Sequence, residues 1–465
     1  MSTTTPRTLF ADHALLPTGW ARDVLLGWND TGSLTTVQPG AAATPDTSRA
    51  AGPLIPGMPN LHSHAFQRVF AGLSEYRSGG IDNASSDSFW TWRDLMYRVA
   101  NAVSPDQLES IATQLYVEML RAGYTAVCEF HYLHHDPQGR PYADPAEMAM
   151  RLFAAARRAG IGITLLPVLY QHAGFGGQPP RADQRRFVNG PDALLDIARR
   201  LRAQGAAVGV APHSLRAVAP QALREVVAGL HAIDANAPVH IHIAEQQQEV
   251  DDCLAWSGQR PVAWLLAKLP VDARWCLVHA THMAEVELRG LAASGAVAGL
   301  CPSTEANLGD GVFDAAAYMA AGGAWGIGSD SHASVDAAEE LRLLEYTQRL
   351  ARRRRNVLAD AAHAQVADHL WGAAVAGGAR ASGRAGAGLV PGQPADFVVL
   401  ATCGALAGLT PPQVLASHVF ASHGRNAVRD VWAGGIQRVR AGAHALQQAA
   451  GECFVGARTE LLREV

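Results

Sequence analysis

The sequence of 465 residues has no CxxC pair, no excess of basic charge and no long apolar run. Its six cysteines are scattered between Cys128 and Cys453, which argues against a thiolate zinc site or a disulfide framework and favours reduced thiols. A formal net charge of -4 provides no basic field, so no nucleic-acid partner is expected. Membrane spans need roughly 20 apolar residues, and the N-terminus lacks a signal peptide's basic start and apolar stretch. We therefore expect a cytoplasmic protein without a membrane partner.

The middle of the chain has a repeating pattern of short and long apolar segments. From Gly57 onward, short β-rich runs alternate with longer helical stretches, which is typical of βαβ units and a parallel sheet. The runs cover residues 58–64, 126–132, 163–170, 208–213, 239–245, 275–282, 297–303 and 325–331. Eight such strands with their crossovers predict a (β/α)8 barrel of the TIM type. A doubly wound open sheet is the competing topology.

Side chains that can bind a metal or transfer a proton lie at the C-terminal end of nearly every run. Examples are His64 in the first run, His242 in the fifth, His279 in the sixth and Asp330 in the eighth, each near the end of its run. In (β/α)8 barrels the active site is built at this face, by the strand ends and the loops that follow them. An open sheet would not gather all these groups around one axis, so the pattern favours the barrel.

The two ends of the chain differ from the middle. Residues 1–56 contain short strands with turns, and residues 386–465 contain Gly-rich hairpin strands followed by a terminal helix. We expect the two ends to pair into one small β-sandwich domain beside a catalytic barrel that covers residues 57–385.

The pair His62 and His64 predicts a metal site. Residues i and i+2 of a strand share one face, so the two imidazoles can point to the same place. His242 and Asp330, from the fifth and eighth runs, complete a set of three histidines and one aspartate. This set suits one divalent ion, with zinc as the expected metal and a position open for water. His240, on the same run as His242, is expected deeper in the barrel as an interior histidine.

Two further groups, Glu245 and His279, remain once the metal set is complete. Hydrolysis at a C=N carbon needs a group that takes and returns protons, and Glu245 fits this role. His279 could hydrogen-bond the attacking hydroxide together with the catalytic carboxylate Asp330. Spacing alone leaves open a second interpretation of His279, as a fourth nitrogen ligand of the metal.

Four separated motifs support this assignment: PGMPNLHSH, HIAE, VHATH and GSDS occur in this order at strand ends. Together they resemble the amidohydrolase superfamily, in the mononuclear branch that deaminates C=N substrates. The resemblance extends over about residues 50–400. It implies that His62, His64, His242 and Asp330 hold the metal. It also implies catalytic roles for Glu245 and His279.

Further segments narrow the resemblance: HSHAFQR, DSFWTWRDLMYR, EFHYLHH, FGG and APHSLRAV. They are similar to the family of N-formimidoyl-L-glutamate deiminases, which act in histidine degradation. The resemblance implies hydrolysis of N-formimidoyl-L-glutamate, a small-molecule substrate, to N-formyl-L-glutamate and ammonia, by a homodimeric enzyme. The substrate contacts it implies fall on Gln67, Arg93, Tyr132, His213 and Arg216.

The charge of this substrate agrees with the arginines. It carries two carboxylates and one cationic amidine-like group, and the guanidinium forks of Arg93 and Arg216 match carboxylate geometry. An alternative is a deaminase of a heterocycle such as guanine on the same metal site, which would need a flat aromatic pocket instead. A barrel that binds metal without catalysis is a third hypothesis, and the presence of Glu245 and His279 argues against it.

Overall fold

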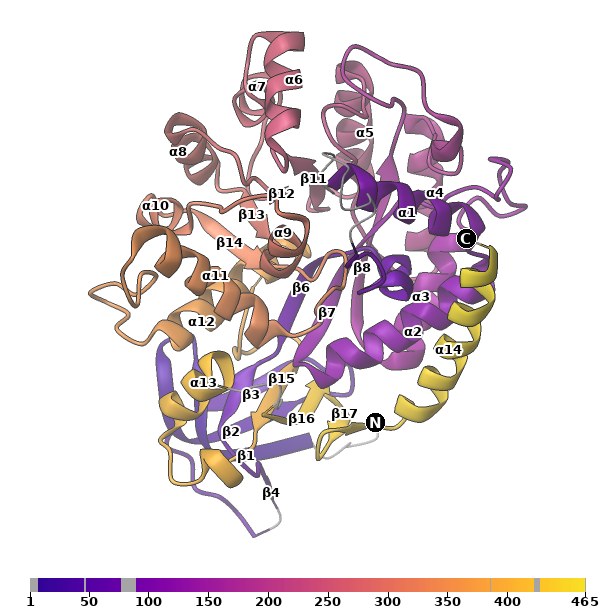
Figure 1. The fold of residues 1–465 in the computed structure, drawn as a ribbon. Helices are drawn as coiled ribbons and strands as arrows, with labels where there is room; N and C mark the ends of the chain where they lie inside the picture. Colours follow the sequence, from indigo (N-terminus) through magenta and orange to yellow (C-terminus); the bar gives the residue numbers. More distant parts are fainter. Residues whose placement is uncertain (1–6, 46, 77–88, 385, 422–426, 465) are drawn as a thin grey trace.

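The computed structural model describes residues 7–45, 47–76, 89–384, 386–421 and 427–464 (Figure 1). Most of the Gly/Ser/Asn-rich loop at 75–86 and the first two residues of the segment DSFWTWRDLMYR lie outside this part. Figure 1 shows a barrel surrounded by helices, with a β-sheet from both ends of the chain beneath it.

The barrel consists of parallel strands at the eight predicted positions. They are β6 (Met58–Ser63), β7 (Tyr124–His131), β8 (Gly162–Leu169), the short pair β9 (Ala207–Val208) and β10 (Ala211–Pro212), β11 (Val239–Ile243), β12 (Trp275–His279), β13 (Val297–Leu300) and β14 (Ala324–Ile327). Two sheets, β10-β8-β7-β6 and β11-β12-β13-β14, make up the wall. Bridges Val210–Val239 and Ser214–His242 join one pair of edges, and Ser63–Asp330 joins the other. The wall is therefore closed. The predicted (β/α)8 barrel is confirmed, and the open sheet is wrong.

The sequence explains why these segments form strands and helices. Every residue of β7 is buried, because a parallel strand in a barrel is covered on both faces. Proline occupies the first turn of several helices, where its missing N–H has no partner to lose. The predicted crossover helices are α2 (Pro105–Arg121), α3 (Glu147–Ala159), α4 (Pro191–Ala203), α5 (Pro220–Ile233) and α8 (Glu285–Ser294).

The remaining helices cover the ends and the outside of the barrel. They are η1 (Ala65–Phe70), α1 (Phe89–Ala102), η2 (Ala182–Gln184), α6 (Gln247–Ser257), α7 (Pro261–Lys268), α9 (Pro302–Leu308), α10 (Ala315–Ala320), α11 (Ala337–Arg352) and α12 (Val366–Ala381). Helix α12 packs on β14 so closely that a Cβ at Gly377 would fall 1.8 Å from the Trp325 carbonyl oxygen. Glycine is thus required where this helix crosses the strand.

Both ends of the chain contribute to a nine-stranded sheet. Its strands are β1 (Arg7–Leu16), β2 (Gly19–Trp28), β3 (Leu34–Gln38), β4 (Ser48–Arg49), β5 (Leu54–Pro56), β15 (Phe397–Leu400), β16 (Val428–Ala433), β17 (Ile436–Arg440) and β18 (Ala443–His444). The sheet curls on itself, since Trp28 Nε1 donates to the Gly435 carbonyl oxygen at 2.9 Å. An apolar cluster with Trp28 and Phe397 fills the interior. The predicted joining of the two ends is confirmed, whereas the domain limits at 56/57 and 385/386 stay predictions.

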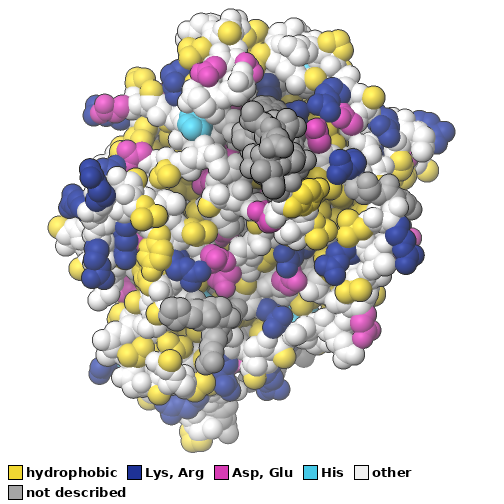
Figure 2. Space-filling model, viewed as in Figure 1, with side chains coloured by type: hydrophobic (Ala, Val, Ile, Leu, Met, Phe, Trp, Pro, Cys, Tyr) yellow, Lys and Arg dark blue, Asp and Glu magenta, His cyan; other side chains and the backbone are white. Residues whose placement is uncertain are grey.

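Within the described residues, the short η3 (Gly404–Leu406) and two α-helices follow the last barrel helix. Helix α13 (Pro411–Phe420) packs on α12, and α14 (Gln447–Glu464) lies along α2. None of the helices in the described ranges is long and apolar enough to span a membrane. On the face drawn in Figure 2, basic and acidic side chains are interspersed, and its described residues form no continuous basic patch.

Candidate metal centre and active site

The residues predicted from the sequence converge at the C-terminal ends of the barrel strands. One cavity there is lined, among others, by His64, Gln67, Arg93, Tyr132, His213, Arg216, His242, Glu245, His279 and Asp330. His62 lies beside them, fully buried, with its ring against those of His64 and His242. The fold therefore brings every predicted metal, catalytic and substrate residue to one place.

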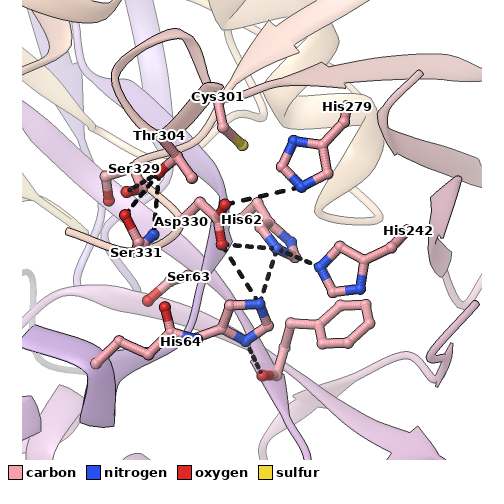
Figure 3. A network of polar contacts seen from close by, with 12 residues as sticks. His62, Ser63, His64, His242, His279, Cys301, Thr304, Ser329, Asp330 and Ser331 are labelled. Atoms are coloured by element: carbon pink, nitrogen blue, oxygen red, sulfur yellow. Dashed lines mark hydrogen bonds and ion pairs between the residues drawn. The ribbon is translucent and has the colours of Figure 1, made fainter. Parts of the chain in front are cut away.

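Three histidines and one aspartate form a compact group of donor atoms (Figure 3). His62 Nε2 lies 3.1 Å from His64 Nε2 and 3.0 Å from His242 Nε2. Asp330 Oδ1 is 3.4 Å from the Nε2 atoms of both His62 and His64. The four donor atoms all lie within 4.8 Å of one another, so this group could hold a metal ion.

The hydrogen bonds of the rings fix which nitrogens face the centre. His64 Nδ1 lies 2.8 Å from the Phe130 carbonyl oxygen, and His242 Nδ1 lies 3.1 Å from that of His213. Because a carbonyl can only accept, both Nδ1 atoms carry the proton and both Nε2 lone pairs point inward. Burial lowers the pKa of His62 to about 3 and also lowers the pKa values of His64 and His242. Neutral imidazole nitrogens facing one another at 3 Å cannot all be satisfied without a cation, so the donor set fits a metal.

The local backbone explains how β14 delivers its carboxylate to the β6 histidines. The Asp330 N–H donates to the His62 carbonyl oxygen at 3.0 Å, which ties the end of β14 to β6. A Cβ at Gly328 would lie 2.7 Å from the His62 Cβ, so only glycine permits this approach. Asp330 has φ +43°, in a region that non-glycine residues seldom adopt. The end of β14 thus holds the Asp330 backbone in a strained conformation that places the carboxylate beside His62 and His64.

His279 and Glu245 face each other next to this donor group. His279 Nε2 is 3.6 Å from Glu245 Oε1 and 3.7 Å from Asp330 Oδ2. Burial raises the pKa of Glu245. Burial opposes protonation of His279, but Glu245, a hydrogen bond to Glu305 and Asp330 together raise its pKa to about 10. His279 Nδ1 lies 3.3 Å from Glu305 Oε1, so one ring nitrogen bonds a carboxylate and Nε2 faces Glu245 and Asp330. This arrangement agrees with the catalytic role predicted for His279.

The residues expected to bind substrate line the same cavity as these carboxylates, and two of them, Arg93 and Arg216, carry positive charge. Gln67 Nε2 donates to the Tyr132 hydroxyl at 3.1 Å, which orders both side chains. The Arg93 guanidinium lies over the Tyr97 ring, 5.4 Å from its centroid. Arg216 Nε is buried and has no hydrogen-bond partner among the described residues. His213 supports the metal group through its carbonyl oxygen and turns its ring towards that of Tyr170, at 4.8 Å.

Two buried carboxyl groups beside Glu245 and His279 were not predicted from the sequence. Glu305 Oε1 lies 3.3 Å from His279 Nδ1, and Asp310 lies in one donor group with Glu245 and His279. The available signal was the segment CPSTEANLGDG after the seventh run, whose two acidic residues flank a glycine. Ser303, a polar residue at the end of the same run, donates its hydroxyl to Glu340 and not to a residue of the site. His240, expected in the interior, donates Nε2 to the Ala381 carbonyl oxygen at 2.7 Å.

Comparison with known proteins agrees with this geometry. The family model described as amidohydrolase family matches residues 54–437, and the model of the formimidoylglutamate deiminase HutF N-terminal domain matches residues 6–51. A formimidoylglutamate deiminase of Pseudomonas aeruginosa is 53% identical, over 98% of this chain and 99% of its own. A 5-methylthioadenosine/S-adenosylhomocysteine deaminase of Natronomonas pharaonis is 28% identical over 87% of this chain and 84% of its own.

A solved structure, that of an amidohydrolase from Brucella melitensis, superposes with a TM-score of 0.91. It is 48% identical in sequence and covers 98% of this chain and 100% of its own. The resemblance drawn from the strand-end motifs is thereby confirmed. The chain belongs to the amidohydrolase family and, within it, to the formimidoylglutamate deiminases.

Proposed function

We propose that this protein hydrolyses N-formimidoyl-L-glutamate to N-formyl-L-glutamate and ammonia in histidine degradation. The observation that carries the proposal is the composition of one cavity, which holds two guanidinium groups, Arg93 and Arg216, together with the carboxyl groups of Glu245 and Asp330. The substrate has the complementary charges, two carboxylates and one cationic formimidoyl group. The relative from Pseudomonas aeruginosa, named a formimidoylglutamate deiminase, supports the same substrate.

Each residue has a role that follows from its position. The guanidinium groups of Arg93 and Arg216 would bind the substrate carboxylates, and Gln67 and Tyr132 would help to orient the chain between them. His62, His64, His242 and Asp330 would hold a divalent ion. When bound, the ion supplies Lewis acidity and makes water a source of hydroxide near neutral pH.

Proton transfer falls to the pair beside the metal group. Water adds to the formimidoyl carbon, and the bond from that carbon to the terminal nitrogen breaks. Glu245, whose pKa burial raises, is suited to take a proton from water and to return it to the departing nitrogen. His279, a donor at Nε2, would stabilise the negative charge that develops on the attacking oxygen. The products are the formyl group and ammonia.

Three further properties stay predictions. Zinc is the metal that three imidazoles and one carboxylate favour, although other borderline divalent ions suit such a set. The family resemblance predicts a homodimer, and the scattered cysteines, which favour reduced thiols, predict the cytoplasm. Counting the metal and measuring the mass in solution test the first two.

The first test is ammonia release from N-formimidoyl-L-glutamate by protein whose metal content has been measured. We expect steady turnover that depends on the metal, with guanine, adenosine and pterins left unchanged. Turnover of a ring substrate, with formimidoylglutamate left intact, would favour the heterocycle deaminase instead. If the metal-reconstituted protein turned over neither formimidoylglutamate nor the ring substrates, a binding protein without catalysis would be favoured.

Removing the positive charge of Arg216 should weaken substrate binding. In R216M we expect kcat/KM for formimidoylglutamate to fall about 10- to 100-fold, because a hydrogen bond to a charged group contributes about 1.5–3 kcal/mol. Most of the change should appear in KM, since the substrate carboxylate is bound equally before and during the reaction.

The matched control is R202M, which removes an arginine that pairs with Asp234 away from the cavity. We expect it to keep the wild-type KM. A normal KM in R216M would show that Arg216 does not bind the substrate.

A further inference from the structure

Glu305 is a buried carboxylate whose position suggests a task in the reaction. It lies on α9, the short helix that follows β13, and its side chain is 7% exposed. Among the described residues, the donor group of three histidines and Asp330 does not include it. The roles proposed above for binding, metal and proton transfer also do not require it.

Its main contact is with the catalytic histidine. Glu305 Oε1 accepts a hydrogen bond from His279 Nδ1 at 3.3 Å and another from the Cys301 N–H at 2.9 Å. The second bond anchors the carboxylate to the start of α9. A carboxylate on one ring nitrogen of a histidine fixes the position of the proton and the orientation of the ring.

The other ring nitrogen of His279, Nε2, faces the carboxyl groups of Glu245 and Asp330. Nε2 is 3.6 Å from Glu245 and 3.7 Å from Asp330, so it lies just beyond hydrogen-bond distance of both carboxylates. The backbone of His279 has φ +66°, outside the range that strands normally adopt. The hydrogen bond from Nδ1 to Glu305 gives the ring a second point of attachment besides its own backbone.

We propose that Glu305 is a positioning residue for the hydrolysis: it holds His279 at Nδ1 so that Nε2 points between Glu245 and Asp330. The inference rests on the proposed function. The competing explanation is purely structural, because the bond to the Cys301 N–H also caps the beginning of α9. The two explanations differ in what each variant does to kcat.

The experiment compares E305Q with E340Q, both as metal-loaded enzyme. Glu340 is also buried and accepts the Ser303 N–H of the same helix at 2.9 Å, but it lies on α11 and does not line the cavity. Both substitutions therefore remove the negative charge of one carboxylate that holds α9, and only in E305Q is that carboxylate also the partner of His279. We measure kcat, KM, bound metal and melting temperature for formimidoylglutamate hydrolysis.

If Glu305 positions His279, kcat should fall about 10- to 100-fold in E305Q, with KM and metal content close to wild type. E340Q should keep its kcat even if its melting temperature falls. Should E305Q not fold, E305D takes its place, because its shorter side chain moves the carboxylate away from Nδ1 and should likewise lower kcat alone.

Three results would overturn the inference: a wild-type kcat in E305Q, a loss of bound metal that explains the lower kcat, or an equal loss in E340Q. Failure of the proposed function is distinguishable, because the wild-type enzyme would then release no ammonia from formimidoylglutamate.

Discussion

Replacement of Glu245 with glutamine is expected to leave the metal in place and to lower ammonia release by about 10²- to 10⁴-fold, the range for loss of a general acid–base group. The physical reason is that glutamine keeps the size of the side chain but cannot carry a proton from water to the leaving nitrogen. Glu245 lies outside the group of three histidines and Asp330, so metal binding should not depend on its charge.

The measurement is kcat at matched metal content, with KM as a second readout. E340Q serves again as a control, since it changes a buried glutamate that does not line the cavity. Retained turnover in E245Q would show that another group carries the proton. Asp310, in one donor group with Glu245 and His279, would then be the next carboxyl group to test.

Loss of one histidine of the candidate metal group is expected to have an equally large effect. In H242N the bound metal should be lost on dialysis, and kcat/KM should fall on the order of 10³-fold or more, because Lewis acidity contributes several kcal/mol. The loss should follow from geometry: His242 Nε2 is 3.0 Å from His62 Nε2, so its removal opens one side of the donor group.

The chain offers a matched control on the same strand. His240 precedes His242 by two residues, but its ring bonds to the Ala381 carbonyl oxygen and lies outside the donor group. H240N should therefore keep its metal. Treatment of the wild-type enzyme with a chelator should abolish turnover, and added zinc should restore it. Full activity of metal-free enzyme would contradict the assigned metal group.

Much of the site could be predicted from the sequence, because all strands of a parallel barrel end at the same face. Side chains at the ends of different strands are therefore close together. His62 and His64 share a strand face, and the ends of the fifth, sixth and eighth strands bring His242, His279 and Asp330 to the same face of the barrel. The regular alternation of runs sufficed to place these ends, and no side-chain detail was needed.

The orientation of side chains within the site could not be predicted in this way. Whether His279 bonds a metal or a carboxylate depends on which atoms lie within about 3 Å of each ring nitrogen, and spacing along the chain does not determine this. Ser303 illustrates the limit. It follows a strand as the other site residues do, yet its hydroxyl donates to Glu340.

The sequence by itself determined the fold class and the family and predicted the members of the candidate metal group, since periodicity, strand order and residue type are local properties. Only the tertiary structure decided which atoms the ring nitrogens face, that two arginines share one cavity with Glu245 and Asp330, and that Glu305 contacts His279. The reason is physical: α9 turns back over the strand ends after β13, and the contacts it makes there join residues that are 26 positions apart in the chain.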